Sequence, residues 1–118
     1  MLTFMNDSDL KSTSRTDICL WLDFYGQLLT RHTRDVLELH YGEDMSLSEI
    51  GENLGISRQA VHDRIRQGLQ SLSEFESKLE LVSKFRKQKD CIDQMVRSLD
   101  DGKLAAAREL LIRLDGLL

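Results

Sequence analysis

The stretch LSEIGENLGISRQAVHDRIRQGLQSL (residues 47–72) predicts two helices joined by a tight turn. Ser46 and Glu49 have the spacing of a capping box, so the first helix should begin directly after the serine. Gly55 should end this helix, because glycine adopts the left-handed conformation at a helix C-terminus without a side-chain penalty. Ser57 is placed to cap the second helix. The order of these signals predicts a helix-turn-helix.

Apolar residues fall on one side of each predicted helix. They are Leu47, Ile50 and Leu54 in the first helix, and Val61, Ile65, Leu69 and Leu72 in the second. Gly51 lies inside the first helix, where glycine costs about 1 kcal/mol relative to alanine. We expect this position to require glycine because the second helix crosses close by.

The polar residues near the start of the second helix are the candidate nucleic-acid-binding residues. They are Ser57, Arg58, Gln59, His62, Asp63 and Arg66. Arginine and glutamine suit guanine and adenine edges, respectively, and Ser57 and Arg58 suit a phosphate at the helix N-terminus. Asp63 would either accept a hydrogen bond from cytosine or pair with Arg64 or Arg66. An ordinary helical hairpin with no binding role is the alternative interpretation.

Composition limits this hypothesis. The chain has 118 residues, no proline and a formal net charge of −4, which favours one domain and disfavours strong nucleic-acid binding by a monomer. We therefore expect a dimer or a protein partner. Cys19 and Cys91 are far apart and lack the spacing of metal ligands. We predict no enzymatic activity, cofactor, metal or membrane span, and a cytoplasmic location.

The chain outside the motif is also predicted to be helical. We expect a disordered or weakly ordered N-terminus (1–14), a helix-turn-helix domain (15–73) and C-terminal helices (74–118). Ser14 or Thr16 should open a first helix with an apolar stripe that ends near Leu29, and Thr30 should cap a second helix. The predicted fold class is all-α, a compact helical domain containing the helix-turn-helix and followed by a long helical extension.

The extension carries a basic run and an apolar stripe. Lys84, Arg86, Lys87 and Lys89 are possible phosphate contacts, although a solvated helix face is the more common meaning of such a run. The apolar stripe is interrupted between Phe85 and Ile92, so a bend or an exposed waist is expected there. A last helix, Lys103 to Leu114, should bury Leu104, Leu111 and Leu114. These helices either fold back on the first ones or form a homodimer, held mainly by Ile92, Val96, Leu99, Leu111 and Leu114.

The sequence resembles the YlxM-like family of bacterial helix-turn-helix proteins. The resemblance rests on FYGQLLT from Phe24, on GEDMSLSEIGENLGISRQAVHDRI, and most specifically on SRQAV (residues 57–61). Family members commonly carry tyrosine after SRQAV, where this chain has His62. More remotely, the motif is similar to region four of bacterial sigma factors, which reads a promoter element in the major groove.

Two functions follow as hypotheses. The first is a sequence-specific DNA-binding regulator. The second is an accessory factor that binds RNA or protein components of the signal recognition particle, since the resemblance implies participation in that pathway or its regulation. Contacts to structured RNA should then be to its shape and backbone.

Overall fold

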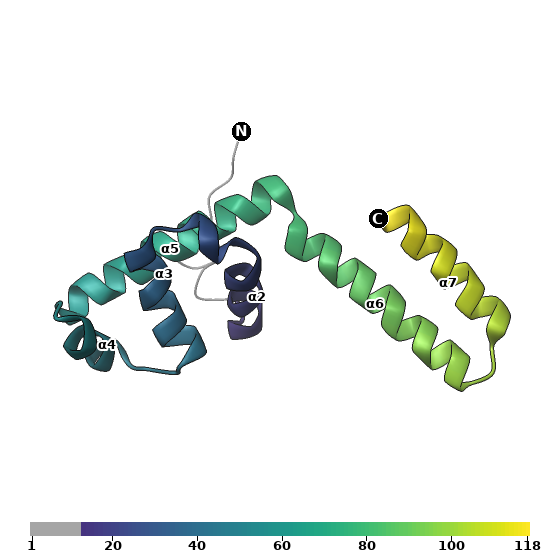
Figure 1. Cartoon of the computed structure of the whole chain (residues 1–118), viewed down its shortest axis with the longest axis horizontal. Helices are drawn as coiled ribbons and strands as arrows, with labels where there is room; N and C mark the ends of the chain where they lie inside the picture. Colours follow the sequence, from purple (N-terminus) through teal and green to yellow (C-terminus); the bar gives the residue numbers. More distant parts are fainter. Residues whose placement is uncertain (1–12) are drawn as a thin grey trace. The chain divides into compact units, whose positions relative to one another are not determined.

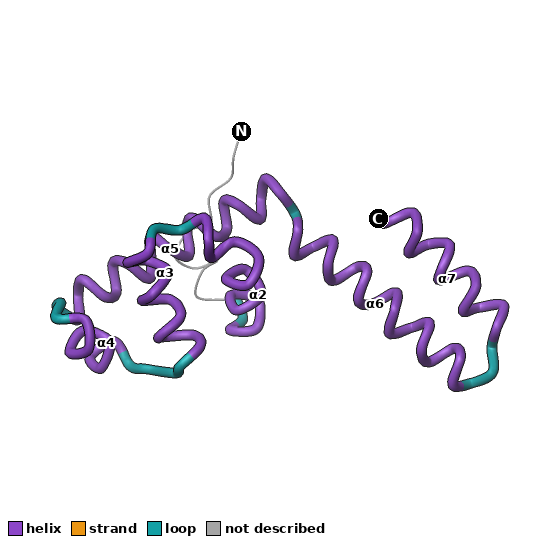
Figure 2. The backbone as a smooth tube through the Cα atoms, in the orientation of Figure 1, coloured by secondary structure: helices purple, strands orange, loops and turns teal. Residues whose placement is uncertain are grey.

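The computed structural model describes residues 13–118, and the regular elements of this part of the chain are all helical (Figures 1 and 2). These residues form two compact units, 13–79 and 80–118. The boundary predicted from sequence lay after residue 73, whereas the helix that contains this residue continues to Leu79. Of the predicted weakly ordered N-terminus, residues 1–12 lie outside the described part.

The first unit contains four α-helices, a 3-10 turn and a π-helical turn. In chain order they are α2 (Arg15–Tyr25), η1 (Gly26–Leu28), α3 (Arg31–Leu37), η2 (Glu38–Gly42), α4 (Leu47–Leu54) and α5 (Arg58–Leu79). Ser14 and Thr30 cap α2 and α3 by accepting hydrogen bonds from backbone amides of their first turns. The predicted starts of both helices are confirmed.

The core of the first unit forms where α2, α3 and α4 each pack against α5 (Figure 1). Tyr25, Leu37, Ile50 and Leu72 are among its fully buried side chains. Gly68 permits the close crossing of α3 and α5, because a Cβ atom there would lie 2.5 Å from Cδ1 of Leu37. Leu28 and Leu54 were expected to be buried but are exposed. Leu28 lies in the η1 turn, where the helical periodicity of α2 has ended, and Leu54 is the last residue of α4.

The second unit is a hairpin of α6 (Leu81–Asp100) and α7 (Leu104–Leu117), which lie side by side and antiparallel (Figure 1). The break before α6 falls at Glu80, whose φ of 53° is left-handed. Of the two expectations for the basic run, the bend is absent, since α6 continues through it, whereas the exposed waist agrees with the exposure of its four basic residues. The seam between the helices holds small residues, with Cys91 Sγ donating to the carbonyl of Leu110 at 3.0 Å and Ala107 buried.

Larger apolar side chains of this hairpin lie outside the seam. We define the hairpin face as Phe85, Ile92, Val96 and Leu99 of α6 with Leu104 and Leu111 of α7 and Leu118 directly after α7, all of which are exposed. Leu104 and Leu111, which were expected to be buried, are therefore exposed in the single chain, because a two-helix hairpin buries only the side of each helix that meets the other. Within the described residues, no helix is long and apolar enough to cross a membrane.

Candidate nucleic-acid interface

The turn between α4 and α5 has the predicted caps. Ser46 and Glu49 form the capping box, with both reciprocal hydrogen bonds present. Gly55 has φ 70° and ψ 32°, the left-handed conformation expected past the end of α4. A Cβ atom on Gly51 would lie 2.7 Å from the backbone oxygen of Ile56. Glycine is thus required at position 51, although the closest obstacle is the turn itself rather than the body of α5.

The turn sets the start of α5 on the surface of the first unit. The six candidate residues, Ser57, Arg58, Gln59, His62, Asp63 and Arg66, are all exposed, and we call them the α5 face. Val61 is fully buried and Ile65 is 8% exposed, so the opposite side of the same turns is held in the core. Ser57 Oγ accepts from the backbone amide of Ala60 at 3.0 Å, which caps the helix.

Asp63 connects two neighbours on this face. Gln59 Nε2 donates a hydrogen bond to Asp63 Oδ1 at 3.0 Å, and His62 Nδ1 lies 3.7 Å from the same oxygen. A glutamine and a histidine are thus close neighbours of this carboxylate. The three side chains form one polar cluster at the second turn of α5.

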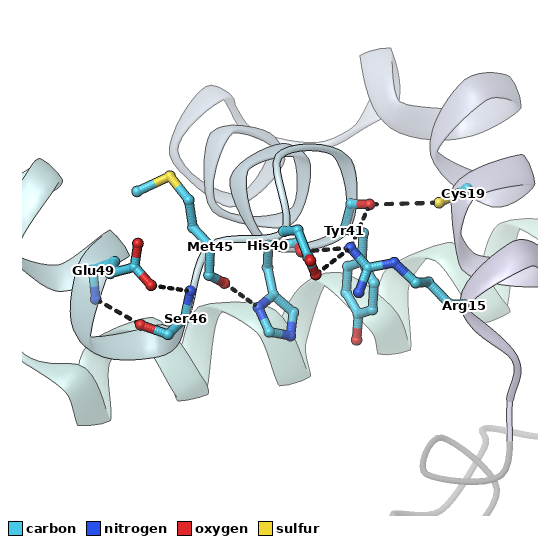
Figure 3. Close-up of polar contacts among 8 residues, drawn as sticks. Arg15, Cys19, His40, Tyr41, Met45, Ser46 and Glu49 are labelled. Carbon is cyan, nitrogen blue, oxygen red and sulfur yellow. Dashed lines mark hydrogen bonds and ion pairs between the residues drawn. The ribbon is translucent and has the colours of Figure 1, made fainter.

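A second polar cluster holds the segment that leads into α4 (Figure 3). Arg15 Nη2 donates to the backbone oxygens of His40 and Tyr41 at 3.1 and 2.9 Å, and lies 3.1 Å from Asp44 Oδ1. His40 Nδ1 is 2.8 Å from the backbone oxygen of Met45. Carbonyl groups at the end of a helix lack hydrogen-bond donors within the helix. The contacts of Arg15 provide donors and a positive charge to such carbonyls near the end of η2. The cluster therefore fixes the path of the chain into the helix-turn-helix.

Tyr41 is the titratable group that this cluster perturbs. Burial raises the pKa of its phenol above the ordinary value, and the nearby Arg15 guanidinium opposes that rise. The guanidinium carbon lies 5.7 Å from the centre of the Tyr41 ring. Sequence reasoning missed this cluster, because Arg15 is 25 and 26 residues from His40 and Tyr41 and no local pattern joins them.

The basic run lies on α6 in the second unit. Lys84, Arg86, Lys87 and Lys89 are all exposed. Lys89 Nζ is 2.8 Å from Asp93 Oδ1, so its charge is already partly compensated. On one continuous helix with 3.6 residues per turn, these four positions point in different directions around the axis. They do not line up as a single track.

Comparison with known proteins places this helix-turn-helix in a family. A family model described as UPF0122, "Putative helix-turn-helix protein, YlxM / p13 like", matches residues 12–110. The chain belongs to this family. UPF0122 proteins from Desulforamulus reducens, Symbiobacterium thermophilum and Staphylococcus carnosus are 42%, 40% and 43% identical to it. The alignments cover 81%, 82% and 82% of this chain and 82%, 91% and 86% of the respective relatives.

Family membership confirms the resemblance drawn from SRQAV and its surroundings. It also agrees with the all-α fold and with the helix-turn-helix at residues 47–72. The names of these relatives state no ligand, so the role of the α5 face has to be argued from its own chemistry.

Proposed function

We propose that this UPF0122 protein is a non-enzymatic DNA-binding regulator that reads a duplex with the α5 face. The observation that carries the proposal is the way the turn presents α5: Val61 and Ile65 hold the helix in the core while six polar side chains around them are exposed. A helix presented in this way fits the major groove, where all four base pairs differ in their donors and acceptors.

The roles follow from position along the helix. Ser57 caps α5 through its oxygen, so its hydroxyl hydrogen is available to a phosphate, and Arg58 adds a positive charge beside it. Gln59, His62, Asp63 and Arg66 lie further along the same surface, where base edges would be. In this arrangement the N-terminus of α5 fixes the orientation of the protein on the duplex, and the next two turns of α5 select the base sequence.

We also propose that the protein acts as a homodimer formed through the hairpin face. On both α6 and α7, the exposed apolar side chains are displaced around the helix axis, in the same direction along the chain, from the side chains that contact the other helix. In an antiparallel pair the two stripes then share one face. A net charge of −4 makes a single copy a weak binder, and two α5 faces on one duplex would compensate for it.

The size of the hairpin face suits a second copy. α6 has 20 residues, so it is about 30 Å long, and two packed helices are about 20 Å wide. The resulting footprint of about 600 Å² approaches the roughly 800 Å² per partner of a standard protein interface. Leu111 and Leu118 of this face are also among the residues that line a shallow hollow of about 330 Å³ at the C-terminal end of α7, which can receive apolar side chains.

The second candidate is an accessory role with the signal recognition particle, as the family resemblance implies. The observation that favours it is the pair of exposed cations Lys84 and Lys87, which share one side of α6 because they are three residues apart and so suit a phosphate backbone without base recognition. Both candidates require a cytoplasmic protein. They differ in whether the α5 face or α6 makes the contact, and in whether the ligand is duplex DNA or structured RNA.

Fluorescence anisotropy with labelled DNA duplexes and RNA hairpins separates these candidates. We expect Arg58→Ala and Gln59→Ala to lose selective duplex binding with unchanged melting temperatures, because both residues are exposed. Arg113→Ala is the matched control, since it removes an exposed arginine from α7 and should leave duplex affinity unchanged. Equal affinities of all four proteins for every duplex would contradict the proposal. Loss of RNA binding in Lys84→Ala and Lys87→Ala alone would favour the second candidate.

A further inference from the structure

The hydrogen bond between Gln59 and Asp63 limits what Gln59 can recognise. Gln59 Nε2 and Asp63 Oδ1 are 3.0 Å apart on successive turns of α5. An ionised carboxylate accepts hydrogen bonds and has none to donate. The nitrogen of the Gln59 amide must therefore face Asp63, and its carbonyl oxygen must face away. In this way Asp63 selects one of the two orientations of the amide.

This orientation leaves Gln59 with one donor and one acceptor for a ligand. A primary amide has two N–H groups and one carbonyl oxygen, and the carboxylate occupies one of the N–H groups. Adenine presents an acceptor at N7 and a donor at N6 in the major groove, which matches the remaining pair. Guanine presents two acceptors, N7 and O6, and this amide has only one hydrogen left for them.

We infer that Asp63 is a positioning residue that makes Gln59 selective for adenine over guanine. The inference rests on the proposed function, because it names the base that the α5 face reads. His62, the residue directly before Asp63, also lies beside this carboxylate, with its Nδ1 3.7 Å from the same oxygen. The carboxylate itself also repels the acceptor atoms of guanine, which adds to the discrimination.

Variants at position 63 separate orientation from charge. Asp63→Glu keeps an acceptor that cannot donate. Asp63→Asn is nearly the same size, but its amide can meet Gln59 with either its oxygen or its nitrogen, so Gln59 is free to turn over. Asp63→Ala removes the partner altogether. The last two variants remove the same negative charge, so both should bind every duplex more tightly by a similar factor.

The experiment is selection of duplexes from a pool with a randomised central segment by the full-length protein, followed by affinity measurements. We expect the wild type to prefer adenine over guanine at one position by about tenfold. Gln59→Ala should lose the preference at that position alone. Asp63→Glu should retain it, while Asp63→Asn and Asp63→Ala should reduce it to about threefold or less.

The outcomes distinguish this inference from the proposed function. If the wild type selects no sequence, both the proposed function and the inference are overturned. If the wild type selects a sequence but Gln59→Ala relaxes no adenine position, the inference alone is overturned. It is likewise overturned if Asp63→Asn and Asp63→Ala raise affinity but keep the tenfold preference, since Asp63 would then act only through its charge.

Discussion

The two compact units bury their apolar side chains to very different extents. In residues 13–79, Leu37, Ile50 and Val61 are fully buried, because three helices pack around α5. In residues 80–118, the seam holds Cys91 and Ala107, while Val96 is 52% exposed. Both units consist of helices with apolar stripes, so the difference comes from how many neighbours each helix has. A helix that packs against three others buries its apolar side chains, whereas a two-helix hairpin leaves one apolar face exposed, which a second copy can cover.

The largest expected effect comes from placing the same charge in each unit. Val61→Asp puts an unpaired carboxylate where valine is fully buried, and should cost about 3–5 kcal/mol, enough to unfold the first unit. Val96→Asp should change helix content little but abolish self-association, with the mass by light scattering staying near the 13.6 kDa of one chain. Circular dichroism and light scattering across a concentration series check both. A stable Val61→Asp protein, or a wild type that is itself monomeric at high concentration, would contradict the comparison.

A pair of glycine substitutions sharpens the comparison at the level of helix packing. Gly68→Ala would bring a Cβ atom within 2.5 Å of Leu37 and 2.8 Å of Thr33, which should destabilise the protein by about 1–3 kcal/mol. Gly116→Ala meets no atom within 4 Å and should be stabilising by about 0.5 kcal/mol, through helix propensity alone. Urea unfolding measures both. Equal effects would mean that α3 and α5 do not cross closely at Gly68.

The polar cluster around Arg15 should contribute less than the packed core. Arg15→Ala removes two hydrogen bonds and an ion pair from a half-exposed side chain, and should cost about 1 kcal/mol after allowance for solvent screening. Arg31→Ala is the control, because its ion pair with Asp35 is long, at 3.9 Å, and exposed. The control should change the free energy of unfolding by only a few tenths of a kcal/mol. An equal loss in both variants would show that the cluster does not hold the segment before α4.

Tyr41 should give the smallest effect, visible only at alkaline pH. Burial raises the pKa of its phenol, so the folded state retains the proton more strongly than the unfolded chain. The resulting stabilisation is present below about pH 10 and is lost as the pH rises through the raised pKa. Urea midpoints between neutral and alkaline pH should therefore fall more steeply for the wild type than for Tyr41→Phe. Urea midpoints that fall equally with pH in both proteins would contradict a pKa of Tyr41 raised by burial.

Local signals predicted the elements around the candidate site well. Ser46, Glu49 and Gly55 act within one or two turns, so their sequence spacing predicted the bounds of α4 and the turn after it. Contacts over longer distances could not be predicted in this way. Gly68 looks like an unfavourable residue in a helix until α3 is placed against it, and Glu80 has no strong preference for the left-handed conformation that separates α5 from α6.

The same limit applies to burial in the second unit and to the α5 face. The pattern of Leu104 and Leu111 is that of a buried stripe, but periodicity does not reveal whether a neighbour exists. The exposure of Arg58 and Gln59 followed from the helical period. The hydrogen bond between Gln59 and Asp63 required side-chain geometry, because the carboxylate had several polar neighbours within reach.

The central claim is that nucleic acid binds on the α5 face of the first unit. Backbone amide chemical-shift mapping of the full-length protein, titrated with its selected DNA duplex, tests this claim most directly. We predict the largest shifts at residues 57–66, with small ones along α6, and their loss in Arg58→Ala. Large shifts confined to the basic run of α6, or none at residues 57–66, would contradict it.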